Sequence, residues 1–309
     1  MRYPALLLPL LTCWACTVAN AQPAPGRVAL VIGNGKYEHA PLPNPPNDAR
    51  AVEQALKACG FQVECRTDCG RKELRRAIQD FGRRLGPGTE GVFYYAGHGM
   101  QIGGDNYLIP VGADIQSEED VLDEAVNVRT VLENMATAGS RVNILILDAC
   151  RGNPFRGSYR GTTRGLARMS APAATLLWYS AQPGSEAPDG NGATSPFTNA
   201  LVHRMLTPGL PVELVFKQIA KDLRADTAGG HAPWQEGVLA GDFCFLGSVA
   251  PDARASLVPS PAPGPRTNWR RWFLGAGLAA GAGVYYYQHQ QSDPGSSAPG
   301  TIVIDVPWR

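Results

Sequence analysis

Short apolar runs alternate with amphipathic stretches between residues 27 and 247. The runs have the length of strands and cover residues 27–33, 61–65, 91–95, 143–147, 174–179 and 240–246. Apolar residues recur at helical spacing over residues 44–59, 71–85, 126–138, 195–206 and 212–224. Continuous apolar runs are typical of parallel strands that are buried on both faces. The alternation therefore predicts an α/β fold with about six mostly parallel strands and with helices on both faces of the sheet.

The first predicted helix has clear start and stop signals. Asn44 is a candidate cap, two prolines follow at positions that tolerate them, and Asp48 places a negative charge in the first turn. Gly60 marks the end of this helix. By contrast, residues 156–172 are rich in Gly, Arg, Ser and Thr and show no apolar period, which predicts a long exposed loop.

Two of the predicted strands are each followed by a reactive residue. His98 comes shortly after the run 91–95, and Cys150 comes shortly after the run 143–147. In open α/β sheets, functional groups gather at the carboxyl ends of the strands. A histidine and a cysteine at the same sheet edge form the arrangement that a thiol nucleophile and its base require. Taken singly, such a cysteine or histidine is more often structural than functional.

Composition narrows the possibilities only slightly. Hydrophobic residues make up 44% and charged residues 18% of the 309 positions, so the chain has the composition of a globular protein. A net charge of +1 gives no electrostatic reason to expect a nucleic acid partner. Gly33-Asn34-Gly35 lacks the third glycine of a dinucleotide-binding loop, and phosphate-loop and His-Glu-x-x-His motifs are absent. No cofactor is therefore expected.

The two ends of the chain differ from its middle. Residues 1–21 have one charge, an apolar stretch and a small-x-small end, which predicts a secretory signal peptide, with an uncleaved N-terminal anchor as the alternative. Residues 22–250 then form the predicted domain. Residues 251–268 are rich in Pro, Ala and Ser and are typical of an extended linker.

An apolar, glycine-rich stretch follows the linker. Residues 269–287 carry aromatic residues at both ends and a Gly277-x-x-x-Gly281 spacing, which predicts a short transmembrane helix and a short tail over residues 288–309. We therefore expect a domain that is exported and anchored to the membrane through residues 269–287. Arg270 and Arg271 would then lie on the outer side, against the positive-inside tendency. Three alternatives stay open: the span is atypical, the segment lies on the membrane surface, or the N-terminal segment does not export the domain.

Five cysteines remain once the predicted signal peptide is removed: Cys59, Cys65, Cys69, Cys150 and Cys244. Four of them could pair in an oxidising compartment while Cys150 stays free, and four cysteines allow three pairings. Cys65 and Cys69 are near enough in sequence to bridge. Buried free thiols are an equally simple interpretation, and a zinc site is less favoured because the chain has no Cys-x-x-Cys pair.

The histidine and cysteine segments, together with their neighbours, resemble the caspase-like clan of cysteine peptidases, most closely the bacterial relatives of metacaspases and paracaspases. In caspases the histidine precedes the cysteine by about 50 residues, and the spacing here is similar, with Asp148 where caspases have Gln. The resemblance covers residues 27–247 and includes the segments Gly33-Asn34, Asn47-Asp48-Ala49, Gly97-His98-Gly99, Tyr107-Leu108-Ile109-Pro110, Asp148-Ala149-Cys150-Arg151-Gly152, Ser180-Ala181-Gln182-Pro183-Gly184 and Ser195-Pro196-Phe197-Thr198. It implies a caspase-like three-layer sandwich.

The resemblance also implies roles for single residues. Cys150 would be the nucleophile and His98 the acid and base. The amides of Gly99 and Cys150 would stabilise the oxyanion, and Ser180 and Ala181 would contact the substrate backbone. No third residue that orients His98 can be identified from the sequence.

Two acids suggest the specificity. Asp148 stands where caspases have a pocket-lining Gln, and Asp48 lies where caspases have a pocket-lining Arg; metacaspases carry acids at both places. Two carboxylates favour a cationic side chain, so the expected substrates are proteins or peptides with Arg or Lys at the cleavage site. The simpler interpretations are a strand-end turn residue for Asp148 and a favourable helix-dipole charge for Asp48.

An enzyme with this specificity could cut its own chain in the predicted loop. The candidate processing sites are Arg156, Arg160, Arg164 and Arg168. Some metacaspases need calcium, and Asp114, Glu118, Glu119 and Asp120 could bind it, although a solvated charged loop is the simpler interpretation. The leading hypothesis is a cysteine endopeptidase. The alternative is a catalytically inactive or latent caspase-like module that binds a partner peptide.

Overall fold

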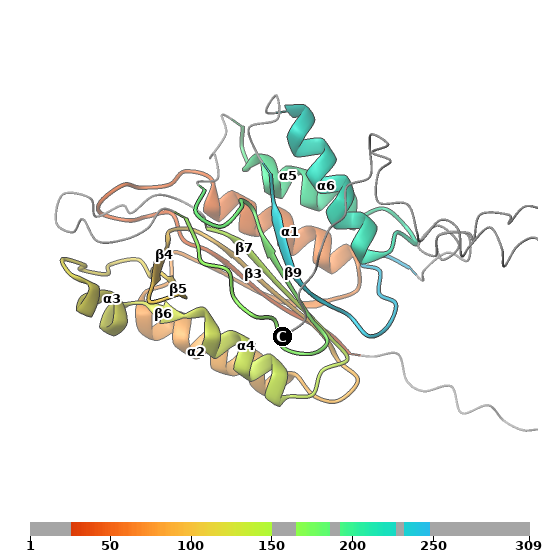
Figure 1. Cartoon of the computed structure of the whole chain (residues 1–309), viewed down its shortest axis with the longest axis horizontal. Coiled ribbons are helices and arrows are strands. Elements are labelled where there is room, and N and C mark those ends of the chain that lie inside the picture. Colours follow the sequence, from red (N-terminus) through yellow and green to blue (C-terminus); the bar gives the residue numbers. More distant parts are fainter. Residues whose placement is uncertain (1–25, 150–164, 186–191, 227–231, 248–309) are drawn as a thin grey trace, which may run out of the picture. The chain divides into compact units, whose positions relative to one another are not determined.

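The computed structural model describes residues 26–149, 165–185, 192–226 and 232–247, all within the first of two compact units, residues 1–257 (Figure 1). Several predictions fall outside these residues. They concern the signal peptide 1–21, the linker 251–268, the membrane helix 269–287 and the tail 288–309, together with Cys150, Arg156, Arg160 and Arg164.

A six-stranded sheet forms the centre of the domain, with the strand order β2-β1-β3-β7-β8-β9. Its strands are β1 (Arg27–Gly33), β2 (Gln62–Thr67), β3 (Glu90–Ala96), β7 (Val142–Asp148), β8 (Thr175–Tyr179) and β9 (Trp234–Val238). All neighbours pair in parallel except β8 and β9, which are antiparallel. The predicted fold of about six mostly parallel strands is confirmed.

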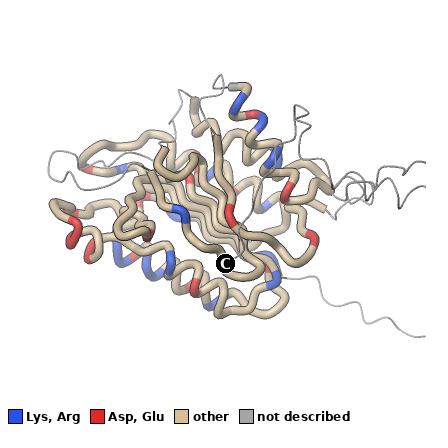
Figure 2. The backbone as a smooth tube through the Cα atoms, viewed as in Figure 1, with Lys and Arg blue, Asp and Glu red and all other residues tan. Residues whose placement is uncertain are grey.

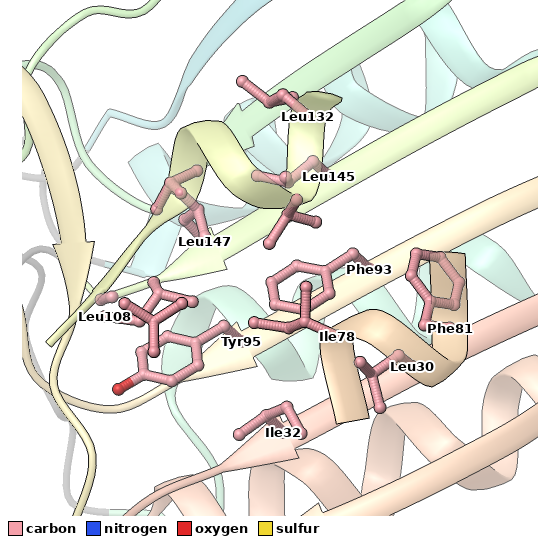
Figure 3. Packing of buried hydrophobic residues seen from close by; sticks show 14 of the residues in the cluster. Leu30, Ile32, Ile78, Phe81, Phe93, Tyr95, Leu108, Leu132, Leu145 and Leu147 are labelled. Carbon is pink, nitrogen blue, oxygen red and sulfur yellow. The ribbon is translucent and has the colours of Figure 1, made fainter. Parts of the chain in front are cut away.

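Helices cover both faces of this sheet and complete three layers (Figure 1). One layer contains α1 (Pro45–Ala58), α5 (Pro196–Met205) and α6 (Val212–Asp226), and the other contains α2 (Arg71–Arg84) and α4 (Val128–Thr137). Alternate strand residues face opposite layers, so Val92 and Tyr94 of β3 pack with the first layer, whereas Phe93 and Tyr95 pack with the second. Figure 3 shows the second core, in which Phe93 and Tyr95 lie beside Ile78 of α2.

Charged residues lie mainly in the outer layers and the connecting segments of the domain. Figure 2 shows Lys, Arg, Asp and Glu on the helices and connecting segments, while the middle of the sheet carries few of them. Strand β7, which is buried along its whole length, has its only charged residue, Asp148, at its carboxyl end. A charge buried in the middle of a sheet would lose its hydration, which disfavours charged residues there.

A second, small sheet was not predicted. It has the order β4-β5-β6, with β4 (Gly99–Ile102), β5 (Asp105–Leu108) and β6 (Val126–Asn127), and α3 (Glu118–Glu124) precedes β6. Its strands have two to four residues, too few for a periodic signal. Together with Tyr37 from the segment after β1, these elements enclose a third core, which contains Met100, Tyr107, Ile109, Ile115, Val121 and Ala125.

The predicted last strand, residues 240–246, is wrong. These residues form no strand, and β9 at Trp234–Val238 closes the sheet in its place. The apolar pattern arose because Phe243 and Phe245 are buried in the core beside α6. Their backbone is held by Arg27, whose guanidinium donates to the carbonyl oxygens of Cys244 and Phe245, so burial occurs here without strand pairing.

The starts of α1 and α3 are capped differently. Asn44 precedes α1 as predicted, but its side chain makes no capping hydrogen bond. Ser117 and Asp120 form a capping box at the start of α3, where each side chain bonds the backbone of the other residue. The acids of residues 118–120 therefore lie in the first turn of a helix, where negative charge is favoured by the helix dipole.

Within the described residues, no helix is long and apolar enough to cross a membrane. Cys59, Cys65, Cys69 and Cys244 are free thiols, so none of the three possible disulfide pairings is present. The part of the chain covered by the structure also contains no group of three or more His, Cys, Asp or Glu side chains that could hold a metal ion.

Candidate active site

Strands β3 and β7 end at the same level of the sheet. Their register pairs Ala96 with Asp148, and the amide of Gly97 donates to the carbonyl oxygen of Asp148 over 3.4 Å. His98 follows Ala96 by two residues, as Cys150 follows Asp148 in the sequence. The described segment ends at Ala149, which is fully buried at this edge. The strand register thus aligns the strand ends that precede His98 and Cys150 in the sequence, and Cys150 itself lies outside the described residues.

The imidazole of His98 is held by a backbone carbonyl. His98 is 3% exposed, and its Nε2 lies 2.7 Å from the carbonyl oxygen of Ala40. Because a carbonyl oxygen only accepts, Nε2 carries the proton in the neutral ring, and Nδ1 is then the unprotonated nitrogen. Ala40 has a φ of 53°, in the left-handed region, which turns the chain at this point. The orienting group that the sequence did not reveal is therefore a backbone atom, which no residue type could have signalled.

Gly99 lies at the start of β4, against the end of β7. A Cβ atom at this position would come within 2.9 Å of the carbonyl oxygen of Ala149 and 3.0 Å of Leu166 Cδ2. Only glycine lets the two segments approach this closely. The predicted oxyanion residue is thus adjacent to the residue that precedes Cys150.

The two predicted pocket acids meet at one serine. Asp48 Oδ1 accepts from the backbone amide of Ser195 over 2.7 Å, and Asp148 Oδ2 accepts from the Ser195 hydroxyl over 2.5 Å. Asp48 is 1% and Asp148 is 3% exposed. Ser195 is the N-cap of α5, and its Oγ also accepts from the amide of Thr198 over 3.0 Å. Residues far apart in the sequence are therefore brought together as one buried cluster.

Hydroxyl groups, and no cation, bond the carboxylate of Asp148 among the described residues. Thr198 Oγ1 donates to Asp148 Oδ2 over 3.1 Å, and the Tyr94 hydroxyl lies 2.6 Å from Thr198 Oγ1. In this described part of the chain, the side chain of Asp148 bonds only Ser195 and Thr198, so no Lys or Arg side chain compensates its charge. A buried carboxylate is costly without a cation, and such a site favours a positively charged ligand.

Ser180 and Ala181 directly follow β8, the strand next to β7. Both are buried, and the amide of Ser180 donates to the carbonyl oxygen of Leu147 over 3.0 Å. They lie at the same carboxyl edge as Asp148. The parallel pairing of β7 with β8 brings them there.

The predicted exposed loop 156–172 is wrong for part of its described portion. Leu166 and Met169 are buried in the second core, although residues 165–172 form no helix or strand. Asn106, fully buried on β5, fixes this segment through its side chain: Nδ2 donates to the carbonyl oxygen of Ala167 over 2.8 Å, and Oδ1 accepts from the backbone amide of Ala167 over 2.6 Å. A single asparagine side chain therefore pairs with the backbone of Ala167 as a neighbouring strand would. The composition of residues 156–172 gave no sign of this pairing.

Arg168, one of the four candidate processing sites, forms an ion pair with Glu236 and lies over the Trp234 ring, 5.7 Å from its centroid. Its side chain is therefore engaged with β9, whereas the other three candidates lie outside the described residues. Of the acids considered for calcium, Asp114 accepts from the side chain of Gln116, and Asp120 belongs to the capping box of α3.

The fold and this edge define a class of protein: an α/β sandwich of the caspase type. The chain belongs to the caspase domain family of peptidases, C14, because the model of that family matches residues 26–243. This family membership supports a cysteine peptidase function in general. The predicted resemblance to caspase-like peptidases is confirmed.

Two curated relatives are similar to part of the chain. The mucosa-associated lymphoid tissue lymphoma translocation protein 1 of Homo sapiens is 31% identical over 165 residues, and its Mus musculus homologue is 30% identical over 165 residues. The matched part covers 53% of this chain and 19% of each relative. The chain thus spans about a fifth of the length of those proteins, and the likeness is limited to that part of them.

Proposed function

We propose that the chain is a cysteine endopeptidase that cleaves peptide bonds after Arg or Lys through an acyl-enzyme. The observation that carries the proposal is the convergence of the buried carboxylates Asp48 and Asp148 on Ser195, at the sheet edge where His98 lies. The caspase domain family supplies the reaction type, and the two carboxylates supply the specificity.

The reaction needs a thiolate, which a free cysteine provides only in small amounts at neutral pH. His98 would accept the Cys150 proton at Nδ1, since Nε2 is directed at the Ala40 carbonyl. The Cys150 sulfur would attack the scissile carbonyl carbon, and the amides of Gly99 and Cys150 would stabilise the oxyanion. His98 would then protonate the leaving amine as the C–N bond breaks. Water hydrolyses the acyl-enzyme with His98 as the base.

The pocket would bind the side chain that precedes the cleaved bond. A guanidinium offers several donors in a plane and can bond two carboxylates at once, whereas a Lys ammonium would act as a point charge. The charge of Asp148, which no described cation compensates, supports a cationic substrate. Ser180 and Ala181, at the adjacent strand end, would contact the substrate backbone.

Fluorogenic peptides that differ only in a final Arg, Lys, Asp or Asn test the proposal, each with the full chain in calcium and in chelator. We expect cleavage of the Arg and Lys peptides and its loss in Cys150→Ala and in His98→Ala. Preferred cleavage after Asp would contradict the pocket assignment. A complete lack of cleavage, with no covalent labelling of Cys150 by an Arg peptide electrophile, would favour the peptide-binding module.

The proposal includes self-cleavage at Arg156, Arg160 or Arg164, with Arg168 less favoured because it is paired with Glu236. We expect the wild-type chain to yield two fragments on incubation and Cys150→Ala to stay intact. An unchanged mass of an active wild-type chain would remove this part of the proposal.

We further propose that the domain is exported and membrane-anchored, on the basis of residues 1–21 and 269–287. We propose no nucleic acid partner for the domain. Fractionation of cells that express the full chain should recover it in the membrane fraction, and deletion of residues 269–287 should release it. Recovery of the full chain in the cytoplasmic fraction would contradict both the proposed export by residues 1–21 and the proposed anchor at residues 269–287.

A further inference from the structure

Tyr37 is in contact with His98 through both its ring and its hydroxyl. The two ring centroids are 4.4 Å apart with an interplanar angle of 50°, and the amide of His98 donates to the Tyr37 hydroxyl over 3.0 Å. Tyr37 is 7% exposed and belongs to the third core, so its position is fixed by packing. The residue comes from the segment after β1, whereas His98 follows β3.

A second tyrosine completes the arrangement. The Tyr95 hydroxyl lies 2.9 Å from the carbonyl oxygen of His98 and 3.3 Å from the Tyr37 hydroxyl. Both hydroxyls are also within 3.0 Å of the carbonyl oxygen of Ile109. Burial raises the pKa of Tyr37 and of Tyr95 above the ordinary value, so both remain protonated donors throughout the physiological range. The two hydroxyls therefore hold the amide and the carbonyl of His98 from one side.

Gly97 shows how tightly this arrangement is built. It has a φ of +151°, and a Cβ atom there would lie 2.7 Å from the Tyr37 hydroxyl and 2.8 Å from the Tyr95 hydroxyl. Any side chain at position 97 would displace at least one hydroxyl. The glycine that precedes the histidine thus makes room for the two tyrosines that hold its backbone.

The Tyr37 segment also carries the acceptor of the imidazole. The amide of Leu42 donates to the carbonyl oxygen of Gly35 over 2.9 Å, which closes the segment into a loop that contains both Tyr37 and Ala40. Asp68 anchors its start by accepting from the amides of Gly35 and Lys36 over 2.9 and 3.0 Å. One loop therefore determines both the ring contact and the Nε2 contact of His98.

We propose that Tyr37 is a positioning residue for His98, which keeps the imidazole against the Ala40 carbonyl and thereby keeps the proton on Nε2. The proposal deepens the proposed function, because Nδ1 must be unprotonated to accept the Cys150 proton. It extends the site to a residue that acts through its contacts with His98. Its role is to hold one tautomer and one ring orientation.

The variants Tyr37→Phe and Tyr37→Leu separate the two contacts. Tyr37→Phe keeps the ring and removes the acceptor of the His98 amide, whereas Tyr37→Leu removes both. Tyr107→Phe is the matched control, because Tyr107 lies in the same core and its hydroxyl takes no part in the His98 contacts. All variants are made in the full chain, together with His98→Asn for assignment of the histidine signals.

The first readout is nitrogen NMR of the labelled histidines, which reports the tautomer without any need for turnover. We expect the neutral His98 ring of the wild type and of Tyr107→Phe to carry its proton on Nε2. The Nε2-protonated fraction should fall in Tyr37→Phe and fall further in Tyr37→Leu. An unchanged tautomer in both Tyr37 variants would overturn the proposal, as would Nδ1 protonation in the wild type.

The second readout is hydrolysis of the Arg peptide. Misplacement of a catalytic group by a fraction of an ångström slows chemistry more than it weakens binding, so kcat should fall roughly tenfold in Tyr37→Phe while KM changes less than about twofold. A lower melting temperature with an unchanged kcat would mean a purely structural role and would overturn the proposal. If the wild type cleaves no peptide and Cys150 is not labelled by the Arg peptide electrophile, the proposed function fails, and the tautomer measurement still decides the role of Tyr37.

Discussion

At the scale of single residues, Ser195 serves two purposes at once. Its backbone amide and hydroxyl bond Asp48 and Asp148, and its Oγ caps α5 through the amide of Thr198. The proposed pocket therefore shares an atom with the start of a helix. Loss of this hydroxyl should affect both the specificity and the stability of the domain.

The substitution Ser195→Ala tests this double role against a serine with one role. It removes the cap and one donor to a buried carboxylate, so the free energy of unfolding should fall by roughly 1–3 kcal/mol. The kcat/KM for an Arg peptide should fall at least about tenfold, because Asp148 loses a fixed partner. Urea unfolding and peptide kinetics provide the two measurements.

Ser117→Ala is the control, because Ser117 caps α3 in a similar way but does not contact the two carboxylates. It should cost about 1 kcal/mol of stability and leave kcat/KM unchanged. Equal effects of the two substitutions on kcat/KM would contradict the role of Ser195 in the pocket.

The sequence could indicate some of these residues and not others. Asp48 and Asp148 were predictable because each lies in a local motif that resembles a known family. Ser195 was predictable only as part of a similar segment, because its bond to Asp48 joins positions 147 residues apart. The Ala40 carbonyl and the Tyr37 contacts depend on how a loop folds, and neither has a periodic or compositional signal.

At the scale of elements, the central strands and the edge strand β2 were predictable, and the edge strand β9 was not. Runs such as β3 and β7 are apolar because both faces are buried. Strand β9 is an antiparallel edge strand that contains Gln235, Glu236 and Gly237, so it lacks this pattern. The small sheet escaped prediction because its strands are short and are stabilised by a third core.

Gly237 should be essential for β9 to pair with β8. It has a φ of +83°, and a Cβ atom would lie 2.1 Å from the carbonyl oxygen of Thr175. We expect Gly237→Ala to lower the free energy of unfolding by roughly 2–4 kcal/mol, because it combines an unfavourable φ with a backbone clash. Chemical denaturation measures this change.

Gly241 offers a matched control a few residues away. A Cβ atom there would meet nothing within 4 Å. Gly241→Ala should therefore change stability by less than about 0.5 kcal/mol. Wild-type stability in Gly237→Ala would contradict the pairing of β9 with β8.

At the scale of the whole domain, the thiols of the fold should make the free energy of unfolding decrease at alkaline pH. Burial raises the pKa of Cys59 to about 11 and the pKa of Cys65 and Cys69 to about 12. In the unfolded chain a thiol ionises near pH ~8.5. Because the folded-state pKa is raised, the stabilising contribution is fully present below about pH 8.5 and is lost as the pH rises through the folded-state pKa.

The free energy of unfolding should therefore fall between about pH 8 and pH 10, by roughly 1–2 kcal/mol for each of the two buried thiols, Cys59 and Cys69, and by less for the partly exposed Cys65. Urea unfolding at several pH values, in the presence of a reductant, measures the slope. Cys69→Ala should reduce that slope, because Cys69 is fully buried. An identical slope in wild type and Cys69→Ala would contradict the assignment.

The central claim is that a buried acidic cluster selects a cation at the cleavage site. The most direct measurement compares kcat/KM for two peptides that end in Arg or in citrulline, its neutral isostere, in the wild type and in Asp148→Asn. We predict that the wild type prefers Arg by roughly 100-fold or more and that Asp148→Asn loses most of this preference by weakening only Arg cleavage. Equal cleavage of the two peptides by the wild type, or an unchanged preference in Asp148→Asn, would contradict the account.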